Sequence, residues 1–126
     1  PEKITVHLGP PDSNAQNVTV SFIDYIKNVA SSEIYPTWDE DALYANIYAQ
    51  ISYALNRVYT EFYRSQGYNF DITNNTAYDQ KYIQGRNIFS NISLTMSFPS
   101  GTDISTETEH RLIKLKEAIG KALFIM

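Results

Sequence analysis

Hydrophobic and polar positions alternate at the beginning of the chain. Residues 4–8 and 17–22 place apolar side chains at every second position, which is the pattern of a half-buried β-strand. The stretch between them, Gly-Pro-Pro-Asp-Ser-Asn at residues 9–14, has the composition of a turn. Residues 3–22 are therefore predicted to form a β-hairpin or two neighbouring strands.

Helical spacing replaces this alternation in the next segment. Apolar side chains recur every three or four residues and predict a short helix over residues 23–33. The helix is expected to end before Pro36, because a proline disfavours helical backbone in the residue that precedes it. The apolar positions are Ile23, Ile26, Val29 and Ala30.

A second, longer helix is predicted over residues 39–65. Thr37 is the expected N-cap, and Glu40 three residues later completes a capping-box pattern with acidic residues in the first turn. Gly67 is the expected stop signal. The apolar face comprises Leu43, Ile47, Ile51, Ala54, Leu55, Val58 and Phe62.

The remaining segments complete an α+β pattern. A capping box at Thr106–Glu109 opens a charged amphipathic helix over residues 107–124. We therefore expect a single α+β domain over residues 1–126: N-terminal β-strands, a short helix, a long central helix and a C-terminal amphipathic helix. Weaker patterns suggest a strand at Phe70–Thr73, a turn at 74–76, a helix at 86–93 and a strand at Leu94–Phe98, while residues 77–84 stay ambiguous.

Composition narrows the classes of partner. The chain has 126 residues, of which 43% are hydrophobic, enough for one folded domain. Its net charge is -4 and its cations are dispersed, so no nucleic-acid partner is expected, since polyanion binding needs clustered Lys and Arg. No apolar run approaches the roughly 18 residues of a membrane span. The chain does not begin with Met and shows no signal-like segment, so it is interpreted as a trimmed or mature fragment.

No metal site or cofactor is expected. The chain has no cysteine, which excludes disulfides, Cys-ligated zinc, iron–sulfur clusters and a thiol nucleophile. His7 and His110 lie far apart and show no metal-ligand spacing. A Ser-His-Asp triad is not supported either, because no G-x-S-x-G motif accompanies His7.

Tyrosine is concentrated in the middle of the chain. All ten Tyr fall between Tyr25 and Tyr82. A tyrosine combines a flat apolar face with a hydroxyl group, which suits packing between helices with a wet edge. The same chemistry suits sugar recognition by stacking and hydrogen bonding. Both interpretations stay open, with packing the more common one.

Glu33 is an acidic residue of particular chemical interest. It lies at the predicted end of the first helix, where the helix dipole gives an acid no stabilisation. Its sequence neighbours are apolar or aromatic, and a partly desolvated carboxyl group there would have a raised pKa and could donate a proton near neutrality. The alternative is an exposed or hydrogen-bonded loop Glu, which is the commoner case.

Three segments resemble the stage II sporulation protein D and amidase-enhancer family. Phe22–Trp38 resembles the family's LEEYVKGVVAAEMPASW segment, and Asp41–Leu55 resembles its EALKAQAVAARTYAL helix in the same register. The resemblance covers about residues 3–93, whereas residues 94–126 diverge. The third segment, Asp71–Thr76 followed by Gln80, Tyr82 and Gly85, resembles the family's D-V-T-D-x-T…Q-x-Y-x-G stretch.

The resemblance implies an activity and a site. The family includes lytic transglycosylases, which cut peptidoglycan glycan strands outside the cytoplasm, notably strands stripped of their stem peptides. Its catalytic Glu falls on Glu33, which would act first as acid and then as base without a second carboxylate. Tyr35 and Trp38 would be sugar-stacking groups. The other implied cleft or support residues are Asp71, Thr73, Tyr78, Gln80 and Tyr82.

Two other interpretations stay open. The segment Gln50–Tyr53 lacks the Arg of the family's A-A-R-T-Y motif, and the C-terminal family motifs are not recognisable. These departures favour a noncatalytic module of the same ancestry that binds glycan or a partner such as a cell-wall amidase or another wall hydrolase. A third interpretation is a structural domain that forms a homodimer through the helix at 107–124.

Overall fold

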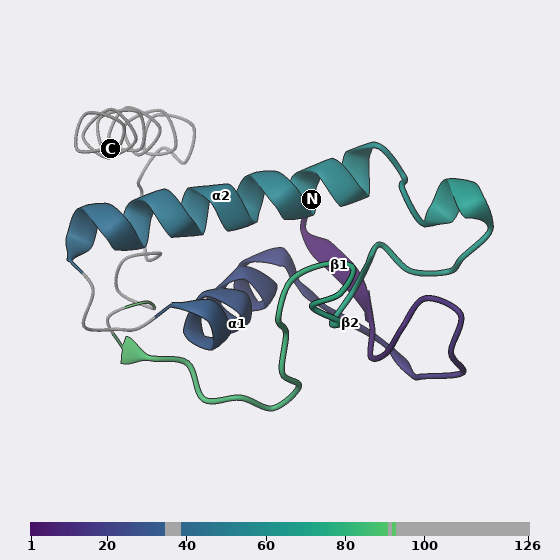
Figure 1. Cartoon of the computed structure of the whole chain (residues 1–126), viewed down its shortest axis with the longest axis horizontal. Helices are drawn as coiled ribbons and strands as arrows, with labels where there is room; N and C mark the ends of the chain where they lie inside the picture. Colours follow the sequence, from purple (N-terminus) through teal and green to yellow (C-terminus); the bar gives the residue numbers. More distant parts are fainter. Residues whose placement is uncertain (35–38, 91, 93–126) are drawn as a thin grey trace.

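A small β-sheet and two helices form the described part of the computed structural model, which covers residues 1–34, 39–90 and 92 (Figure 1). The strands come first in the chain and the helices follow, so the predicted α+β class is confirmed. The predicted strand at 94–98 and the predicted helix at 107–124 lie outside the described residues, as does part of the predicted helix at 86–93. No helix in the described part is long and apolar enough to cross a membrane.

The sheet has the order β2-β1-β3. β1 (Lys3–His7) and β2 (Asn17–Ser21) pair antiparallel, with Lys3 opposite Ser21. This pairing confirms the predicted hairpin. β3 (Ile72–Thr73) lies along the other side of β1 and is parallel to it.

The first helix, α1 (Phe22–Glu33), follows β2 without a loop. Ser21 is its N-cap, and the Ser21 hydroxyl accepts a hydrogen bond from the backbone N–H of Asp24 at 3.1 Å. The predicted helix at 23–33 is thus confirmed to within one residue. Its buried face carries Tyr25, Ile26, Val29 and Ala30.

The second helix, α2 (Glu40–Tyr59), begins and ends differently from the prediction. Its N-cap is Asp39, whose carboxylate accepts from the backbone N–H of Ala42 at 2.9 Å; Thr37, the predicted cap, lies outside the described residues. The helix stops at Tyr59 rather than near residue 65, because Glu61 adopts a positive φ of 51° that helical backbone does not allow.

A short turn of 3-10 helix, Arg64–Gln66, follows and is closed by Gly67. Gly67 has a φ of 96°, a left-handed conformation that glycine adopts without a Cβ clash. Phe62, predicted on the apolar face of a continuous helix, instead lies in the turn between α2 and this 3-10 helix and is 40% exposed.

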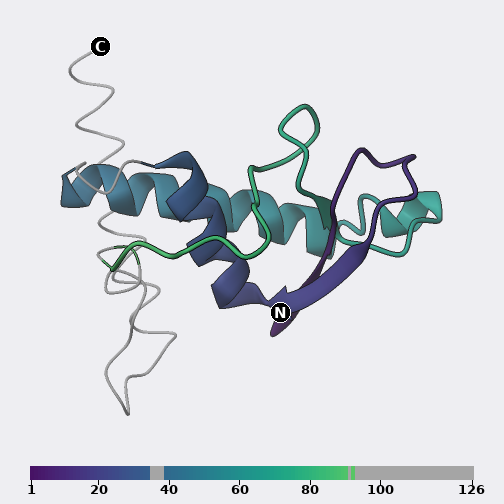
Figure 2. The same ribbon diagram turned by 90° about the horizontal axis from the view of Figure 1, so that it is seen from below.

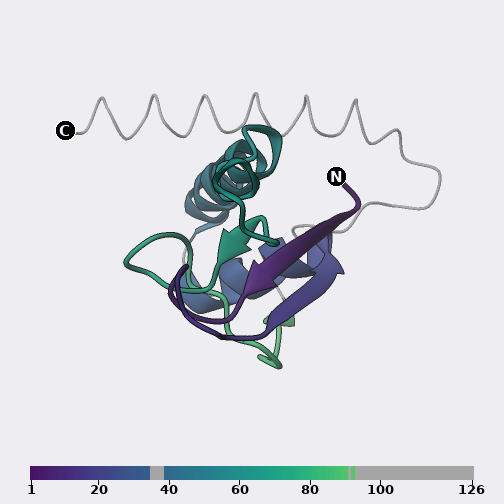
Figure 3. The same ribbon diagram turned by 90° about the vertical axis from the view of Figure 1, so that its right-hand side faces the viewer.

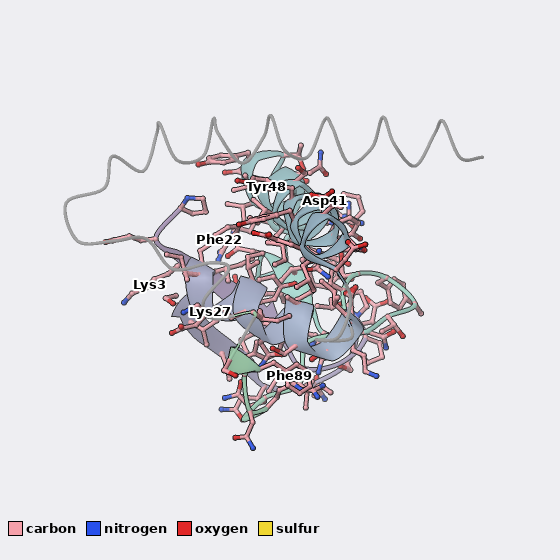
Figure 4. The ribbon with its side chains drawn as sticks, turned by 90° about the vertical axis from the view of Figure 1, so that its left-hand side faces the viewer. Lys3, Phe22, Lys27, Asp41, Tyr48 and Phe89 are labelled. Atoms are coloured by element: carbon pink, nitrogen blue, oxygen red, sulfur yellow. The ribbon has the colours of Figure 1, made fainter. Side chains whose placement is uncertain are left out.

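The hydrophobic core lies where both helices meet the sheet. α1 and the sheet lie on the same side of α2 (Figures 1 and 3). Side chains fill the space between α1 and α2 (Figure 4), so the helices and the sheet share one core. Its fully buried members include Ile4, Val6, Tyr25, Ile26, Val29, Ile72 and Ile92.

Residues 74–89, after β3, pack along α1 without forming a helix or strand (Figure 2). The helix predicted at 86–93 is therefore wrong for residues 86–89, whereas Ser90 and Ile92 are helical. The Asn28 side chain pairs with the backbone of Ile83, donating to its carbonyl at 2.7 Å and accepting from its N–H at 2.9 Å. The hydroxyl of Ser31 accepts from the backbone N–H of Phe89 at 3.2 Å. Side chains of α1 therefore supply hydrogen bonds that the backbone of this segment would otherwise make within a helix or a sheet.

Candidate functional site

Glu33, the last residue of α1, stands at the edge of a shallow pocket of about 290 Å³. We call it the Glu33 pocket. Three parts of the chain build it: the end of α1, one face of α2, and the segment after β3. Its lining residues are Glu33, Asn46, Ala49, Gln50, Tyr53, Asp79 and Gln80.

The contribution of α2 follows from helical geometry. Residues 46, 49, 50 and 53 are separated by three, four and seven positions, so they lie on one face of the helix. The first member, Asn46, donates from its side-chain nitrogen to the carbonyl of Ala42 at 2.8 Å, within α2 itself. The wall of the pocket that α2 supplies is therefore a helix surface.

The Glu33 carboxyl group combines access to solvent with partial burial. The residue as a whole is exposed, and its Oε1 accepts a hydrogen bond from the backbone N–H of Lys81 at 3.1 Å. Desolvation by the surrounding protein raises the pKa of Glu33 above its ordinary value of 4.5, against the opposing effects of the Lys81 N–H and the Lys81 charge. A carboxyl group with a raised pKa holds its proton at higher pH and can act as a general acid.

Asp79 is the other carboxylate of the pocket and is fully engaged within the protein. Its side chain is completely buried and forms an ion pair with Arg57 at 2.9 Å. It also accepts from the hydroxyls of Tyr53 at 3.0 Å and Tyr63 at 2.5 Å. Thr73 donates to it from both its backbone N–H and its hydroxyl, at 3.0 and 2.7 Å. Asp79 thus ties the end of α2 and the following turn to β3.

Gln80 connects the two helices behind the pocket. Its Oε1 accepts from the hydroxyl of Tyr25 at 2.9 Å, and its Nε2 donates to the backbone carbonyl of Gln50 at 2.9 Å. Burial raises the pKa of Tyr25 well above its ordinary value, with the charges of Asp79 and Glu33 adding to the effect, so the hydroxyl remains a donor. Both polar ends of Gln80 therefore have partners inside the protein.

The other residues predicted for the cleft are distributed over the fold. Asp71 pairs with Arg64 at 2.8 Å and accepts from the N–H of Thr5. Tyr82 is buried and stacks on Tyr25, with ring centroids 5.5 Å apart.

Among the predicted residues, Glu33 and Gln80 line the Glu33 pocket. Thr73 reaches it only indirectly, through its bonds to Asp79. Tyr78 is 52% exposed, and its carbonyl accepts from Tyr53 at 2.8 Å. Tyr35 and Trp38 lie outside the described residues.

Some pocket residues are not among those the sequence predicted. Asn46, Gln50 and Tyr53 share the helix face described above, so their spacing was visible once α2 was predicted to be helical. Asp79 gave no such signal, because its partners come from positions 6 to 26 residues away.

A second pocket lies at the far end of the sheet, around His7. Its volume is also about 290 Å³, and residues of the turn after β1 and of the segment 67–70 line it. His7 is buried and stacks on Phe70 at 4.4 Å, with its ring nitrogens 2.6 Å from the Asn17 side-chain oxygen and 3.2 Å from the Ser13 hydroxyl. The Ser13 hydroxyl donates to the carbonyl of Pro10 at 2.8 Å, so these contacts hold the turn against β2.

The described residues contain no group of three or more His, Cys, Asp or Glu side chains that could hold a metal ion. Asp79 is surrounded by hydrogen-bond donors, and Glu33 accepts its hydrogen bond from the backbone N–H of Lys81. The chemistry that the Glu33 pocket offers is therefore proton transfer by a single carboxyl group, together with amide and hydroxyl groups that can bind a polar ligand.

Comparison with known families identifies the chain. The family model described as SpoIID, stage II sporulation protein, matches residues 13–121. The chain therefore belongs to the stage II sporulation protein family, a family related to sporulation and the cell wall. The matched range runs beyond residue 93, so the similarity to the family extends into the part of the chain where its motifs are not recognisable. Searches of curated proteins and of solved structures found no match.

Proposed function

We propose that this domain remodels peptidoglycan glycan strands as a lytic transglycosylase in which Glu33 is the single general acid and base. The observation that carries the proposal is that Glu33 lines a pocket and that partial burial raises the pKa of its carboxyl group. Membership of the stage II sporulation protein family supports a role at the cell wall. The domain would then act outside the cytoplasm, with glycan strands as its substrate.

The proposed reaction needs one carboxyl group in two protonation states. Protonated Glu33 donates its proton to the glycosidic oxygen as the bond from that oxygen to C1 of the muramic acid breaks. The resulting Glu33 carboxylate then takes the proton of the C6 hydroxyl of the same sugar. The C6 oxygen attacks C1 and closes a 1,6-anhydro ring, so no water is consumed and Glu33 regains its proton.

The state of Asp79 favours this reaction over hydrolysis. Glycoside hydrolysis generally uses two carboxylates, one as acid and one as nucleophile or base. Asp79 lines the same pocket, but its carboxylate is buried and bound to Arg57, Tyr53, Tyr63 and Thr73. A carboxylate with these partners is poorly placed to attack a sugar or activate water, which leaves Glu33 as the reactive group.

The remaining residues of the proposed site have supporting roles. Tyr35 and Trp38 follow Glu33 in the sequence and are proposed to stack on sugar rings. Gln80 and Thr73 are proposed to position the pocket through their bonds to α2 and Asp79. The proposed support residues nearer the sheet and the surface are Asp71, Tyr78 and Tyr82.

Digestion of purified, peptide-stripped glycan strands tests the proposal, with products analysed by mass spectrometry. The wild type is expected to release products with 1,6-anhydro ends, and Glu33→Gln to lower their yield by about 100-fold or more, the usual size of a lost general acid–base. Glu40→Gln is the matched control, because Glu40 is an exposed acid at the start of α2 and its loss changes the net charge equally. Equal product yields from wild type and Glu33→Gln would contradict the proposal.

A noncatalytic module is the second candidate, and one sequence observation favours it: the segment Gln50–Tyr53 lacks the family's Arg. Such a module would bind glycan strands or a wall hydrolase such as an amidase. It predicts that folded wild type and Glu33→Gln both retain strands in a pulldown while neither releases anhydro products. The digestion experiment therefore separates the two candidates.

A further inference from the structure

The backbone N–H of Lys81 is held beside the carboxyl group of Glu33. It donates to the Oε1 of Glu33 at 3.1 Å and links the end of α1 to a residue 48 positions further along the chain. Both neighbours of Lys81 are buried, since Gln80 is 7% exposed and Tyr82 is 6% exposed. Lys81 itself is exposed, so its side chain reaches solvent while its backbone runs between two buried residues.

Contacts with both helices anchor these two neighbours. Gln80 accepts from the Tyr25 hydroxyl of α1 and donates to the Gln50 carbonyl of α2, each at 2.9 Å. The ring of Tyr82 stacks on that of Tyr25, with 5.5 Å between the centroids. Because both sides are anchored, the Lys81 N–H cannot turn away from the carboxyl group without breaking buried contacts. It is therefore a preorganised hydrogen-bond donor.

This donor distinguishes the two oxygens of Glu33. A protonated carboxyl group has a carbonyl oxygen, which accepts a hydrogen bond, and a hydroxyl group, which donates its proton. The Lys81 N–H donates, so its partner is the carbonyl oxygen, and that partner is Oε1. The transferable proton of Glu33 then lies on Oε2.

From this arrangement we propose that Lys81 is a positioning residue: its backbone N–H holds Oε1 of Glu33 and makes Oε2 the atom that gives up and regains the proton. The inference rests on the proposed transglycosylase function, in which Glu33 gives its proton to the glycosidic oxygen and recovers one from the C6 hydroxyl. It adds the atom that carries the proton and the group that selects this atom. The contact can be measured in the free protein, without substrate.

The charge of Lys81 has a second effect, which can be separated from the first. Desolvation raises the pKa of Glu33, and the Lys81 charge opposes that rise. The charge belongs to the side chain and the N–H to the backbone. Lys81→Gln therefore removes the charge and keeps the N–H, whereas Lys81→Pro removes both. Lys81 lies outside helices and strands, where proline is best tolerated.

Amide proton shifts of the full chain test the contact by NMR between about pH 4 and pH 8. An ionised acceptor forms a stronger hydrogen bond than a neutral one, so the Lys81 amide proton should move downfield as Glu33 ionises. This change should vanish in Glu33→Gln. The Ile83 N–H is the matched control in the same segment, because it donates at 2.9 Å to the uncharged side-chain oxygen of Asn28. Its shift should not follow Glu33.

Digestion of peptide-stripped glycan strands tests the positioning role. Lys81→Gln should stay active with its pH profile moved to higher pH, because loss of the nearby positive charge raises the pKa of Glu33 further. Lys81→Pro should lower kcat about tenfold or more relative to Lys81→Gln, with little change in KM, because the reacting carboxyl group is no longer oriented. Melting temperatures of both variants show whether they are folded.

Two results would overturn the inference. One is a Lys81 amide proton that does not follow the ionisation of Glu33, and the other is a folded Lys81→Pro variant as active as Lys81→Gln. If Lys81→Pro does not fold, the amide measurement on the wild type decides alone. A wild type that releases no anhydro products would instead overturn the transglycosylase proposal, and the amide shift would still report whether Lys81 holds Glu33.

Discussion

Glu33 is the residue whose partial burial bears most directly on the proposed reaction. Its carboxyl group is partly desolvated, and the Lys81 N–H does not fully compensate, so its pKa is raised. The folded protein therefore holds the Glu33 proton more tightly than the unfolded chain does. This is the condition that a general acid needs, and it makes the ionised form of the folded state less stable.

The pH dependence of stability follows with a definite sign. Below the ordinary pKa of 4.5, Glu33 is protonated in both the folded and unfolded states and favours neither. As pH rises from there through the raised pKa, the unfolded chain releases the proton first, so the free energy of unfolding falls. We expect the wild type to lose stability relative to Glu33→Gln over this window, as measured by urea denaturation of both proteins between about pH 4 and pH 8.

The difference between the two proteins cancels the effects of the other titrating groups. A wild type that gains stability relative to Glu33→Gln as pH rises would contradict the account. That result would mean that the Lys81 N–H and charge outweigh desolvation and lower the pKa of Glu33.

Sequence reasoning reached Glu33 but not Gln50 or Asp79. Glu33 stands in a recognisable motif next to a predicted helix end, so its neighbours in the chain already indicate its environment. The role of Asp79 depends on Arg57 and Tyr63, which lie 22 and 16 residues away. The burial of Gln50 becomes visible only in the structure, because an amide side chain on a helix is normally solvated.

At the scale of elements, the end of α2 is held by charge rather than by apolar packing alone. Arg57 in the last turn lies over the ring of Phe62, with 3.9 Å between its guanidinium carbon and the ring centroid, and pairs with buried Asp79. Asp79 in turn bonds Thr73 of β3. One carboxylate therefore joins the helix end, the turn and the sheet.

Asp79→Asn is expected to lower the free energy of unfolding by about 2–4 kcal/mol, because it leaves Arg57 without its charged partner and removes acceptors from several donors. Asp71→Asn is the matched control, since Asp71 also pairs with an arginine but Arg64 is 42% exposed. That more exposed pair should cost about 1 kcal/mol or less. Urea denaturation measures both, and a loss for Asp71→Asn equal to or greater than that for Asp79→Asn would contradict this ranking.

Element boundaries were predicted less well than the elements themselves. The periodicity of apolar residues located α1 and α2 because both helices bury one face. The end of α2 was misplaced because the apolar pattern continues through Phe62, while the positive φ of Glu61 turns the chain away. Glutamate seldom adopts a positive φ, so the residue type at position 61 does not predict this turn.

The whole molecule brings distant segments into one site. α1 supplies Glu33, α2 supplies Gln50, and the segment after β3 supplies Asp79 and Gln80. The parallel pairing of β1 with β3 makes this possible, since it places the following residues beside both helices. That pairing joins residues more than 60 positions apart and left no pattern in the sequence, although both strands were predicted.

The position of bound glycan on the domain distinguishes the Glu33 pocket from the His7 pocket as the binding site. Amide chemical shifts of the Glu33→Gln variant would be followed during titration with peptide-stripped glycan fragments, so that the complex is not consumed. The account predicts that the largest shifts fall at the Gln50 and Lys81 amides, which mark the Glu33 pocket, while Asn69 and Phe70 of the His7 pocket stay unchanged. Shifts confined to residues 67–70, with Gln50 and Lys81 unaffected, would contradict it.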